Sequence, residues 1–298
     1  MLLPGVAAAL MYMTEFFIIV PLHVVLLVIL LRGQEFKKLT AYKIMTHMSI
    51  CECTQMIGYL MGDVMSISQT TFHPYVARVG GSFLNAGWIG IVTLTFLLNL
   101  NRFIVFIGFK MTAQSERRFY NIMLLFTWTI AALVFAAHMT PDLSMIYIIE
   151  RNTFWFVDTP LAKVGGKIEY FYLSITLFCT FVVCVATVTT IIVKRNLYSA
   201  QFKISAGEIK VFVQSLIIFL YLTMIRCAWQ FLSPIMSGEA QFIALGIATQ
   251  AVGGLNPLLY CSMNKTIRRH LFKMIGLKKY TTTVSTVITL ESSSNRKP

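Results

Sequence analysis

The chain of 298 residues is 57% hydrophobic and only 12% charged, whereas a soluble globular domain carries about a quarter of its residues as charged ones. A surface so poor in charge cannot face water, so the composition indicates a protein surrounded by lipid. A transmembrane helix needs roughly 20 apolar residues, so the length allows about eight or nine spans and no added soluble domain. The net charge of +13 lies in short loops between apolar runs, which indicates membrane orientation and excludes nucleic-acid binding.

Seven apolar segments follow one another along the chain, each bounded by charged or turn-rich residues. We interpret all of them as helices, because a transmembrane β-barrel would show ten-residue segments of alternating hydrophobicity, which are missing here. The predicted spans are 10–31, 44–62, 79–101, 119–137, 170–193, 211–232 and 241–261. The expected fold class is therefore an all-α membrane protein, a bundle of seven transmembrane helices.

The basic residues of the loops predict the orientation of the bundle. Twenty Lys and Arg residues lie after spans one, three, five and seven, against four in the loops on the other side. The positive-inside rule therefore places the N-terminus outside and the C-terminus in the cytosol. After the seventh span, Ile267, Leu271, Met274 and Ile275 form an apolar stripe opposite basic residues, which predicts a short amphipathic cytosolic helix on the inner leaflet of the bilayer.

The chain divides into a seven-transmembrane domain, residues 1–277, which includes the amphipathic helix, and a disordered cytosolic tail, residues 278–298. The tail is rich in Ser and Thr between residues 281 and 294. This segment is either a target for phosphorylation or a plain linker.

A carboxylate interrupts the second predicted span near its middle. Placing an ionisable residue at mid-bilayer costs on the order of 2.5–3.5 kcal/mol, so Glu52 requires an explanation. We interpret Glu52 as a polar switch beside span seven, with a protonated, hydrogen-bonded packing residue as the alternative. The single histidines His23 and His47 are expected to make hydrogen bonds in the core, because nothing near them completes a metal site.

A second ionisable residue, Arg226, lies in the outer part of span six. Trp229 and Gln230 follow at i+3 and i+4, so the three side chains share one helix face. Arg226 is expected to clamp an anionic or polar ligand, to pair with Glu169 or Asp63, or to extend outward to the membrane surface.

Asn85 and Trp88 share one face in the outer third of span three. Together with the three residues of span six they are expected to line a cavity open to the outside, although aromatic residues in membrane helices also serve as packing or interfacial belts. The predicted ligand-binding residues are Asn85, Trp88, Glu169, Arg226, Trp229 and Gln230.

No motif of hydrolytic or transfer chemistry is present. Glu and His residues are scattered over separate spans, and no Gly-rich phosphate loop occurs. The six cysteines all fall in or at the ends of spans and show neither a disulfide framework nor a zinc-ligand spacing. The sequence therefore predicts a protein that is not an enzyme and has no cofactor and no metal site.

The cytosolic halves of spans three and seven carry two motifs, Asn101-Arg102-Phe103 and Asn256-Pro257-Leu258-Leu259-Tyr260. They resemble the Asp-Arg-Tyr and Asn-Pro-x-x-Tyr motifs of rhodopsin-like G-protein-coupled receptors, with Glu52 in place of the family's Asp in span two. The resemblance implies G-protein coupling by Asn101, Arg102 and Phe103 and an activation switch made of Glu52, Asn256, Pro257 and Tyr260.

More narrowly, segments 42–48 and 264–269, with the pair at 101–102, resemble nematode chemoreceptors of serpentine receptor class T, over about residues 40–276. The resemblance implies a receptor in the cell membrane of a sensory cilium, binding an external small molecule and signalling through a heterotrimeric G protein. The chain departs from rhodopsin-like receptors in three respects. The Cys-Trp-x-Pro motif of span six is missing, because Trp229 is followed by Gln230 and Phe231. No cysteine lies between Cys53 and Cys179, so the usual outer disulfide is missing. Asn101 replaces the acidic partner of Arg102, which predicts raised basal signalling.

Two alternative functions remain from the residues alone. A ligand-gated cation channel of seven spans, as in insect odorant receptors, would have its N-terminus inside, against the distribution of basic residues. A cation- or proton-coupled transporter using Glu52 would need a charged path across the bilayer, and only Glu52 lies near the midplane.

Overall fold

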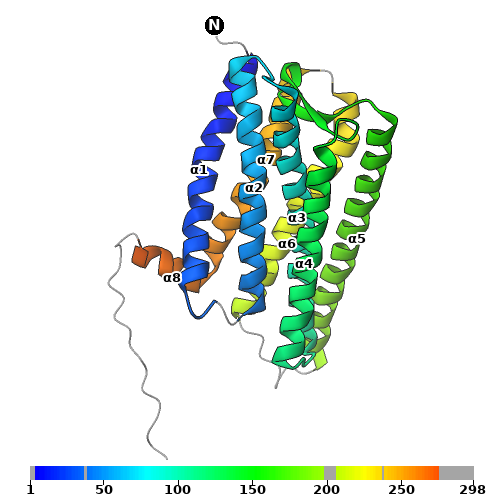
Figure 1. Cartoon of the computed structure of the whole chain (residues 1–298). Coiled ribbons are helices and arrows are strands. Elements are labelled where there is room, and N and C mark those ends of the chain that lie inside the picture. Colours follow the sequence, from blue (N-terminus) through cyan, green and yellow to red (C-terminus); the bar gives the residue numbers. More distant parts are fainter. Residues whose placement is uncertain (1–3, 37–38, 198–205, 237, 275–298) are drawn as a thin grey trace, which may run out of the picture.

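A computed structural model describes residues 4–36, 39–197, 206–236 and 238–274. The helical bundle predicted from the sequence is confirmed: seven long helices run alternately up and down, and a short one, α8, turns sideways at the foot (Figure 1). The tail predicted for residues 278–298 lies outside the described residues. The helices are α1 (Pro4–Arg32), α2 (Thr40–Ser68), α3 (Pro74–Ile107), α4 (Ala113–His138), α5 (Pro160–Leu197), α6 (Ala206–Cys227), α7 (Glu239–Met263) and α8 (Lys265–Met274).

Each long helix extends beyond or differs from its predicted span at one or both ends. The predicted spans cover only the apolar segments, whereas helical backbone continues past the lipid into polar caps. Helix α3, for example, begins at Pro74, where the ring of His73 caps its first turn, and ends at Gly108, whose φ of 74° stops the helix. A left-handed residue after the last turn is a common helix stop, and glycine adopts it without strain.

Helix α2 carries polar side chains along much of its length. Within the described part of the chain, six helices are long and apolar enough to cross a membrane, and α2 is not among them. Its length of 29 residues equals that of α1. Its polar side chains point into the bundle, where Ser49, Glu52, Gln55, Asp63 and Ser66 are all buried.

Helices α2 and α3 approach each other closely because glycines line their contact. A Cβ atom built on Gly58 would lie 2.7 Å from the carbonyl oxygen of Gly80, and one on Gly87 would lie 2.9 Å from the carbonyl oxygen of Cys51. Real Cβ atoms do not come so near to backbone, so these positions admit only glycine. The side chains of α3 are buried along most of the helix, which makes α3 the centre of the bundle.

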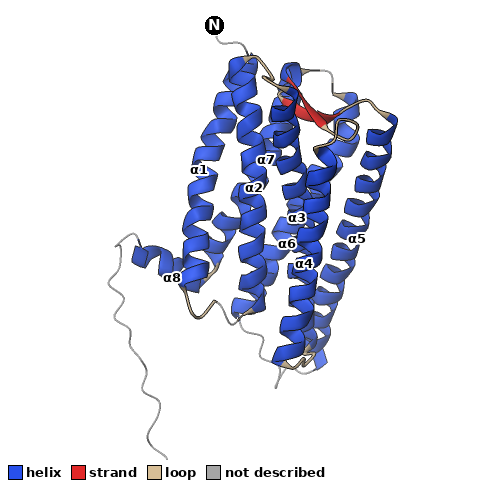
Figure 2. Cartoon of the chain, viewed as in Figure 1, coloured by secondary structure: helices blue, strands red, loops and turns tan. Residues whose placement is uncertain are grey.

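The outer end of the bundle carries a feature that the sequence analysis did not predict. The connection between α4 and α5 forms a β-hairpin of β1 (Met145–Ile148) and β2 (Thr153–Phe156), shown in red in Figure 2. The two strands are antiparallel, with Met145 opposite Phe156 and Ile148 opposite Thr153. Strands of four residues give too short a pattern to stand out beside long apolar runs.

The outer end of the sixth span is also different from the uninterrupted helix predicted over residues 211–232. Helix α6 ends at Cys227 and continues as a π-helical turn (Ala228–Leu232) and a 3-10 turn (Ser233–Ile235). Pro234 explains the change, because proline has no N–H and its ring clashes with the carbonyl four residues before it. The π turn displaces Trp229 and Gln230 from regular α-helical positions, next to the cavity described below.

Candidate functional site

A cavity of about 430 Å³ opens in the outer half of the bundle. Its walls come from α1, α2, α3, α5, α6, α7, the turns that follow α6, and the hairpin, which lies above it. The cavity brings together all six residues predicted to bind ligand: Asn85, Trp88, Glu169, Arg226, Trp229 and Gln230. Its size suits a small organic molecule.

Asn85 is fixed by partners from two other helices. Its side-chain nitrogen donates to Glu169 Oε2 at 2.8 Å and lies 2.7 Å from His138 Nε2. The other ring nitrogen of His138 lies 2.6 Å from the carbonyl oxygen of Leu143. A carbonyl only accepts, so this Nδ1 carries the proton and Nε2 accepts from Asn85. The network joins α3, α4 and α5 on one wall of the cavity, and His138 was not among the predicted site residues.

Arg226 does not pair with Glu169 or Asp63, which was one of the alternatives left open by the sequence. Within the described residues no carboxylate lies within ion-pair distance of its guanidinium. The guanidinium instead lies 5.3 Å from the centre of the Tyr170 ring, a cation–π contact. Its Nε is buried without a hydrogen-bond partner.

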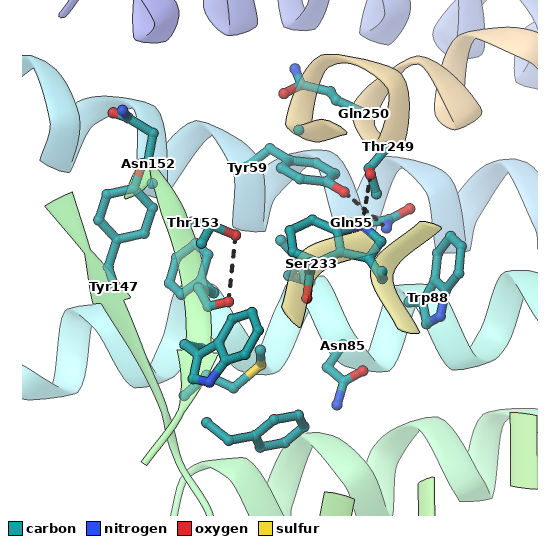
Figure 3. A pocket seen from close by; sticks show the side chains of 18 of the residues that line it. Gln55, Tyr59, Asn85, Trp88, Tyr147, Asn152, Thr153, Ser233, Thr249 and Gln250 are labelled. Atoms are coloured by element: carbon teal, nitrogen blue, oxygen red, sulfur yellow. Dashed lines mark hydrogen bonds between the residues drawn. The ribbon is translucent and has the colours of Figure 1, made fainter. Parts of the chain in front are cut away.

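Trp229 connects the π turn to α7. Its indole nitrogen donates to Thr249 Oγ1 at 2.8 Å, and this hydroxyl in turn donates to the carbonyl of Leu245 at 2.6 Å. Figure 3 shows Thr249 at the end of this bond, with Gln55 and Tyr59 nearby. This bond therefore joins the turns that follow α6 directly to α7.

The hairpin is held in place without a disulfide, because all six cysteines are free thiols. Ser66 at the outer end of α2 donates to Asn152 Oδ1 at 2.6 Å and lies 2.7 Å from the hydroxyl of Tyr147. Since Ser66 has a single hydroxyl proton, Tyr147 must be the donor in the second bond. Burial raises the pKa of Tyr147, so its hydroxyl keeps the proton that it donates.

The underside of the hairpin packs against glycines of α2 and α3. A Cβ atom on Gly62 would lie 2.8 Å from the ring of Tyr147, and one on Gly80 would lie 2.8 Å from the ring of Phe154. These aromatic rings are buried together with Met145. The glycine contacts and the Ser66 hydrogen bonds thus hold the hairpin against α2 and α3 in the absence of a disulfide.

The predicted switch residues meet in the middle of the bundle. The side-chain nitrogen of Asn256 donates to Glu52 Oε1 and lies 3.1 Å from the sulfur of Met48. The sulfur of Met48 also lies 3.6 Å from the hydroxyl of Tyr260, which is completely buried. Pro257 is buried within α7. Glu52 therefore faces span seven, and its partner there is Asn256.

His23 belongs to the same cluster, although no partner for it could be predicted from the sequence. Its Nε2 lies 2.7 Å from the carbonyl oxygen of Gly253 and 3.5 Å from Glu52 Oε2. His47 also makes a core hydrogen bond, since its Nδ1 accepts from the indole nitrogen of Trp128 at 3.0 Å. The spacing of His23 and Glu52 along the chain contains no signal for their contact, because they lie on different helices.

A second cavity, of about 480 Å³, lies at the cytosolic end of the bundle. Asn101 and Arg102 line it, together with Tyr42 from α2 and residues at the start of α6 and α8, whereas Phe103 does not. Arg102 is only 8% exposed, and its Nε has no hydrogen-bond partner. Asn264 closes one side, donating to the hydroxyl of Tyr42 at 2.9 Å.

The predicted amphipathic helix at the cytosolic end is confirmed as α8. The side-chain oxygen of Asn264 accepts from the backbone nitrogens of Thr266 at 3.0 Å and Ile267 at 3.2 Å, which caps the first turn. Ile267 is buried against the bundle, and Arg269 on the opposite side is exposed.

Comparisons with known proteins agree with this geometry. The crystal structure of squid rhodopsin superposes with a TM-score of 0.74 at 10% sequence identity, covering 92% of this chain and 85% of that one. At this identity the similarity concerns the fold alone. No curated protein matches the sequence. The family described as the serpentine type 7TM GPCR chemoreceptor Srt matches residues 5–284. The chain therefore belongs to the Srt family of serpentine seven-transmembrane chemoreceptors.

Proposed function

We propose that this protein binds an external small molecule in its outer cavity and signals through a heterotrimeric G protein at its cytosolic cavity. One observation supports the proposal above all: two cavities lie at opposite ends of the same helices. The outer one collects the polar and aromatic residues expected to contact a ligand. The inner one contains Arg102, a buried cation with an unused donor.

Helix α6 is the element that connects the two cavities in this mechanism. Near its outer end Trp229 is hydrogen-bonded to Thr249 of α7. Near its inner end Gln214 donates to the carbonyl of Leu259 at 2.7 Å, and Ser215 donates to Asn99 of α3 at 2.9 Å. A ligand that favours another position of the outer turn shifts the population of states in which the inner bonds are broken.

The middle of the bundle transmits the same change through α7. Pro257 removes one backbone hydrogen bond of α7 and so allows the inner half of the helix to bend. The bend is controlled by the bond between Asn256 and Glu52 and by the buried Tyr260. We propose that these four residues, with His23 as their neighbour, form the activation switch.

The proposed partners follow from the same arrangement. Parting of the inner helix ends exposes Asn101, Arg102 and Phe103 to the G protein. Helix α8 lies on the inner leaflet of the cell membrane, with its basic face toward anionic headgroups. The Ser- and Thr-rich segment 281–294, outside the described residues, is the proposed target of a receptor kinase and arrestin. The family suggests the sensory cilium of a chemosensory neuron as the location.

A G-protein activation assay tests the proposal. The full chain is expressed in cells and challenged with a panel of volatile and water-soluble metabolites, beside the variant Arg102→Ala at matched surface expression. The control is Arg32→Ala, which removes an exposed arginine at the end of α1, outside the cytosolic cavity. We expect ligand responses from the unchanged chain and from the control. A response that survives Arg102→Ala undiminished would falsify the coupling mechanism.

A further inference from the structure

One wall of the outer cavity presents oxygen atoms that have no hydrogen-bond donor. Gln55 and Asp63 on α2 and Gln250 on α7 line the cavity, and each side chain is at most 3% exposed. Among the residues that the structure describes, Gln55 Oε1, Asp63 Oδ2 and Gln250 Oε1 are buried and have no hydrogen-bond partner. Figure 3 shows Gln55 and Gln250 on the side of α2 and α7, away from Asn85. Buried polar atoms normally have partners, so three free acceptors in one wall indicate a ligand that supplies donors.

The orientation of Gln250 is determined by its other atom. Its Nε2 donates to the backbone carbonyl of Tyr12 at 2.8 Å. A carbonyl only accepts hydrogen bonds, so the nitrogen must face Tyr12 and the oxygen must remain free. Gln55 Nε2 donates to the hydroxyl of Tyr59 at 3.5 Å, which leaves Oε1 as its free atom. A hydroxyl can also donate, so only Gln250 has its orientation determined by its partner.

Asp63 places an acidic side chain in this wall without a compensating cation. Within the described residues no Lys, Arg or His lies within ion-pair distance of Asp63. Asp63 also interacts electrostatically with another acidic residue, Glu15 of α1, whose Oε2 is buried and has no hydrogen-bond partner among the described residues. A buried carboxylate is costly unless a cation or several donors compensate it. A positively charged ligand would remove that cost.

The opposite wall, at α5 and α6, differs in its charges, although Arg226 Nε there is also without a hydrogen-bond partner among the described residues. Arg226 and Glu169 there interact electrostatically, and Glu169 also accepts from Asn85. Both signs of charge are thus present at the α5 and α6 end, whereas the α2 and α7 end is acidic only. The imbalance favours a cation over an anion as the ligand.

The rings around the acidic wall suit the same ligand. Tyr12, Tyr59 and Tyr147 line the cavity, and each is close enough to Asp63 to interact with it electrostatically. The faces of aromatic rings attract cations, and their carbon atoms contact the apolar part of an amine.

We propose that the ligand is a small organic amine in its protonated form. Its ammonium group lies beside Asp63, and its N–H groups donate to Gln55 and Gln250, while the apolar part fills the cavity toward Trp88 and Trp229. The inference rests on the proposed receptor function, because it names the ligand class for the same cavity.

The test measures binding independently of signalling. The purified full chain in lipid nanodiscs is heated in the presence of matched compounds: 2-phenylethylamine, 2-phenylethanol and phenylacetate, and likewise hexylamine, hexanol and hexanoate. A ligand that binds the folded state raises the midpoint of thermal unfolding. We expect the amines alone to do so. Asp63→Asn should weaken their binding roughly tenfold to a hundredfold, the value of a charge-assisted hydrogen bond.

The matched control is Asp158→Asn, which removes a carboxylate that is 86% exposed and lies outside the cavity; amine binding should be unchanged. If Asp63→Asn does not fold, Gln250→Leu tests the same wall and should also weaken amine binding. The proposal is overturned if no amine stabilises the chain, if the alcohols or acids stabilise it equally, or if the folded variant binds amines as tightly as the unchanged chain.

G-protein activation, recorded with the same compounds, separates the two proposals. Activation by the alcohols or acids would leave the receptor function standing and overturn the amine. Binding of amines without any activation would instead contradict the receptor function and keep the ligand class.

Discussion

The hydrogen bonds that hold the hairpin over the outer cavity make a quantitative prediction. Ser66 is completely buried, and its two partners, Tyr147 and Asn152, are 6% and 7% exposed. Ser66→Ala removes both bonds at once and leaves the Tyr147 hydroxyl and the Asn152 oxygen unsatisfied. Tyr147→Phe removes only one bond, and Ser66 still donates to Asn152. Ser66→Ala should therefore destabilise the hairpin more than Tyr147→Phe does.

A neutral hydrogen bond contributes about 1 kcal/mol, and each buried polar group left without a partner costs about 1–3 kcal/mol. Tyr147→Phe should lower the free energy of opening of the hairpin by about 1 kcal/mol, or roughly fivefold in the opening equilibrium. Ser66→Ala, with two groups stranded, should lower it by at least about 2 kcal/mol, or roughly thirtyfold. The helical bundle itself should change little, because the hairpin opens locally.

Hydrogen–deuterium exchange of the chain in nanodiscs measures this opening. The amides of residues 145–156 should exchange faster in both variants and fastest in Ser66→Ala. The control is Thr54→Ala, which removes an exposed hydroxyl of the same helix that bonds only to the carbonyl of Ile50. Equal exchange in the two variants, or protection of the hairpin unchanged by Ser66→Ala, would refute the account of how the loop is held without a disulfide.

Two further predictions concern the cytosolic end and the packing of α2. Asn101→Asp places a carboxylate beside Arg102, which should restrain the arginine side chain and lower agonist-free signalling. Signalling is measured as second messenger at matched surface expression, and an unchanged basal level would contradict this prediction. Gly58→Ala forces a Cβ to within 2.7 Å of the Gly80 carbonyl, so it should greatly reduce the folded protein at the surface. Gly166→Ala meets no atom within 4 Å and should be tolerated, and equal surface levels of the two would contradict the close packing.

The helical bundle could be predicted from the sequence because lipid strongly restricts the conformations that a backbone can adopt. Every amide in the hydrocarbon must find its partner within its own segment, so long apolar runs can only be helices. Ionisable residues such as Glu52 and Arg226 also stand out in the sequence. The free energy of placing them in lipid is so unfavourable that their side chains must face the inside of the bundle. Helical periodicity then placed Asn85 with Trp88, and Arg226 with Trp229, on shared faces, and these faces do line one cavity.

Periodicity could not show which faces of different helices meet. His23 and Glu52 lie on separate helices, and nothing in either segment predicts that they lie 3.5 Å apart. Asp63, Gln55 and Gln250 were not predicted as site residues for the same reason. Each is an ordinary polar residue in its own helix, and only the packing of α2 against α7 and α1 leaves their oxygens without donors.

The β-hairpin shows most clearly the difference between what the sequence determines and what the tertiary structure decides. Local sequence fixes the seven helices, since hydrogen bonding within a helix is complete without any neighbour. A hairpin of four-residue strands is stable only when it packs against other segments. Here it packs against glycines of α2 and α3 and is hydrogen-bonded to Ser66. Composition and charge are thus sufficient to predict the number and orientation of the helices. The shape and polarity of the cavity, in contrast, arise only when side chains that are distant in the sequence pack together.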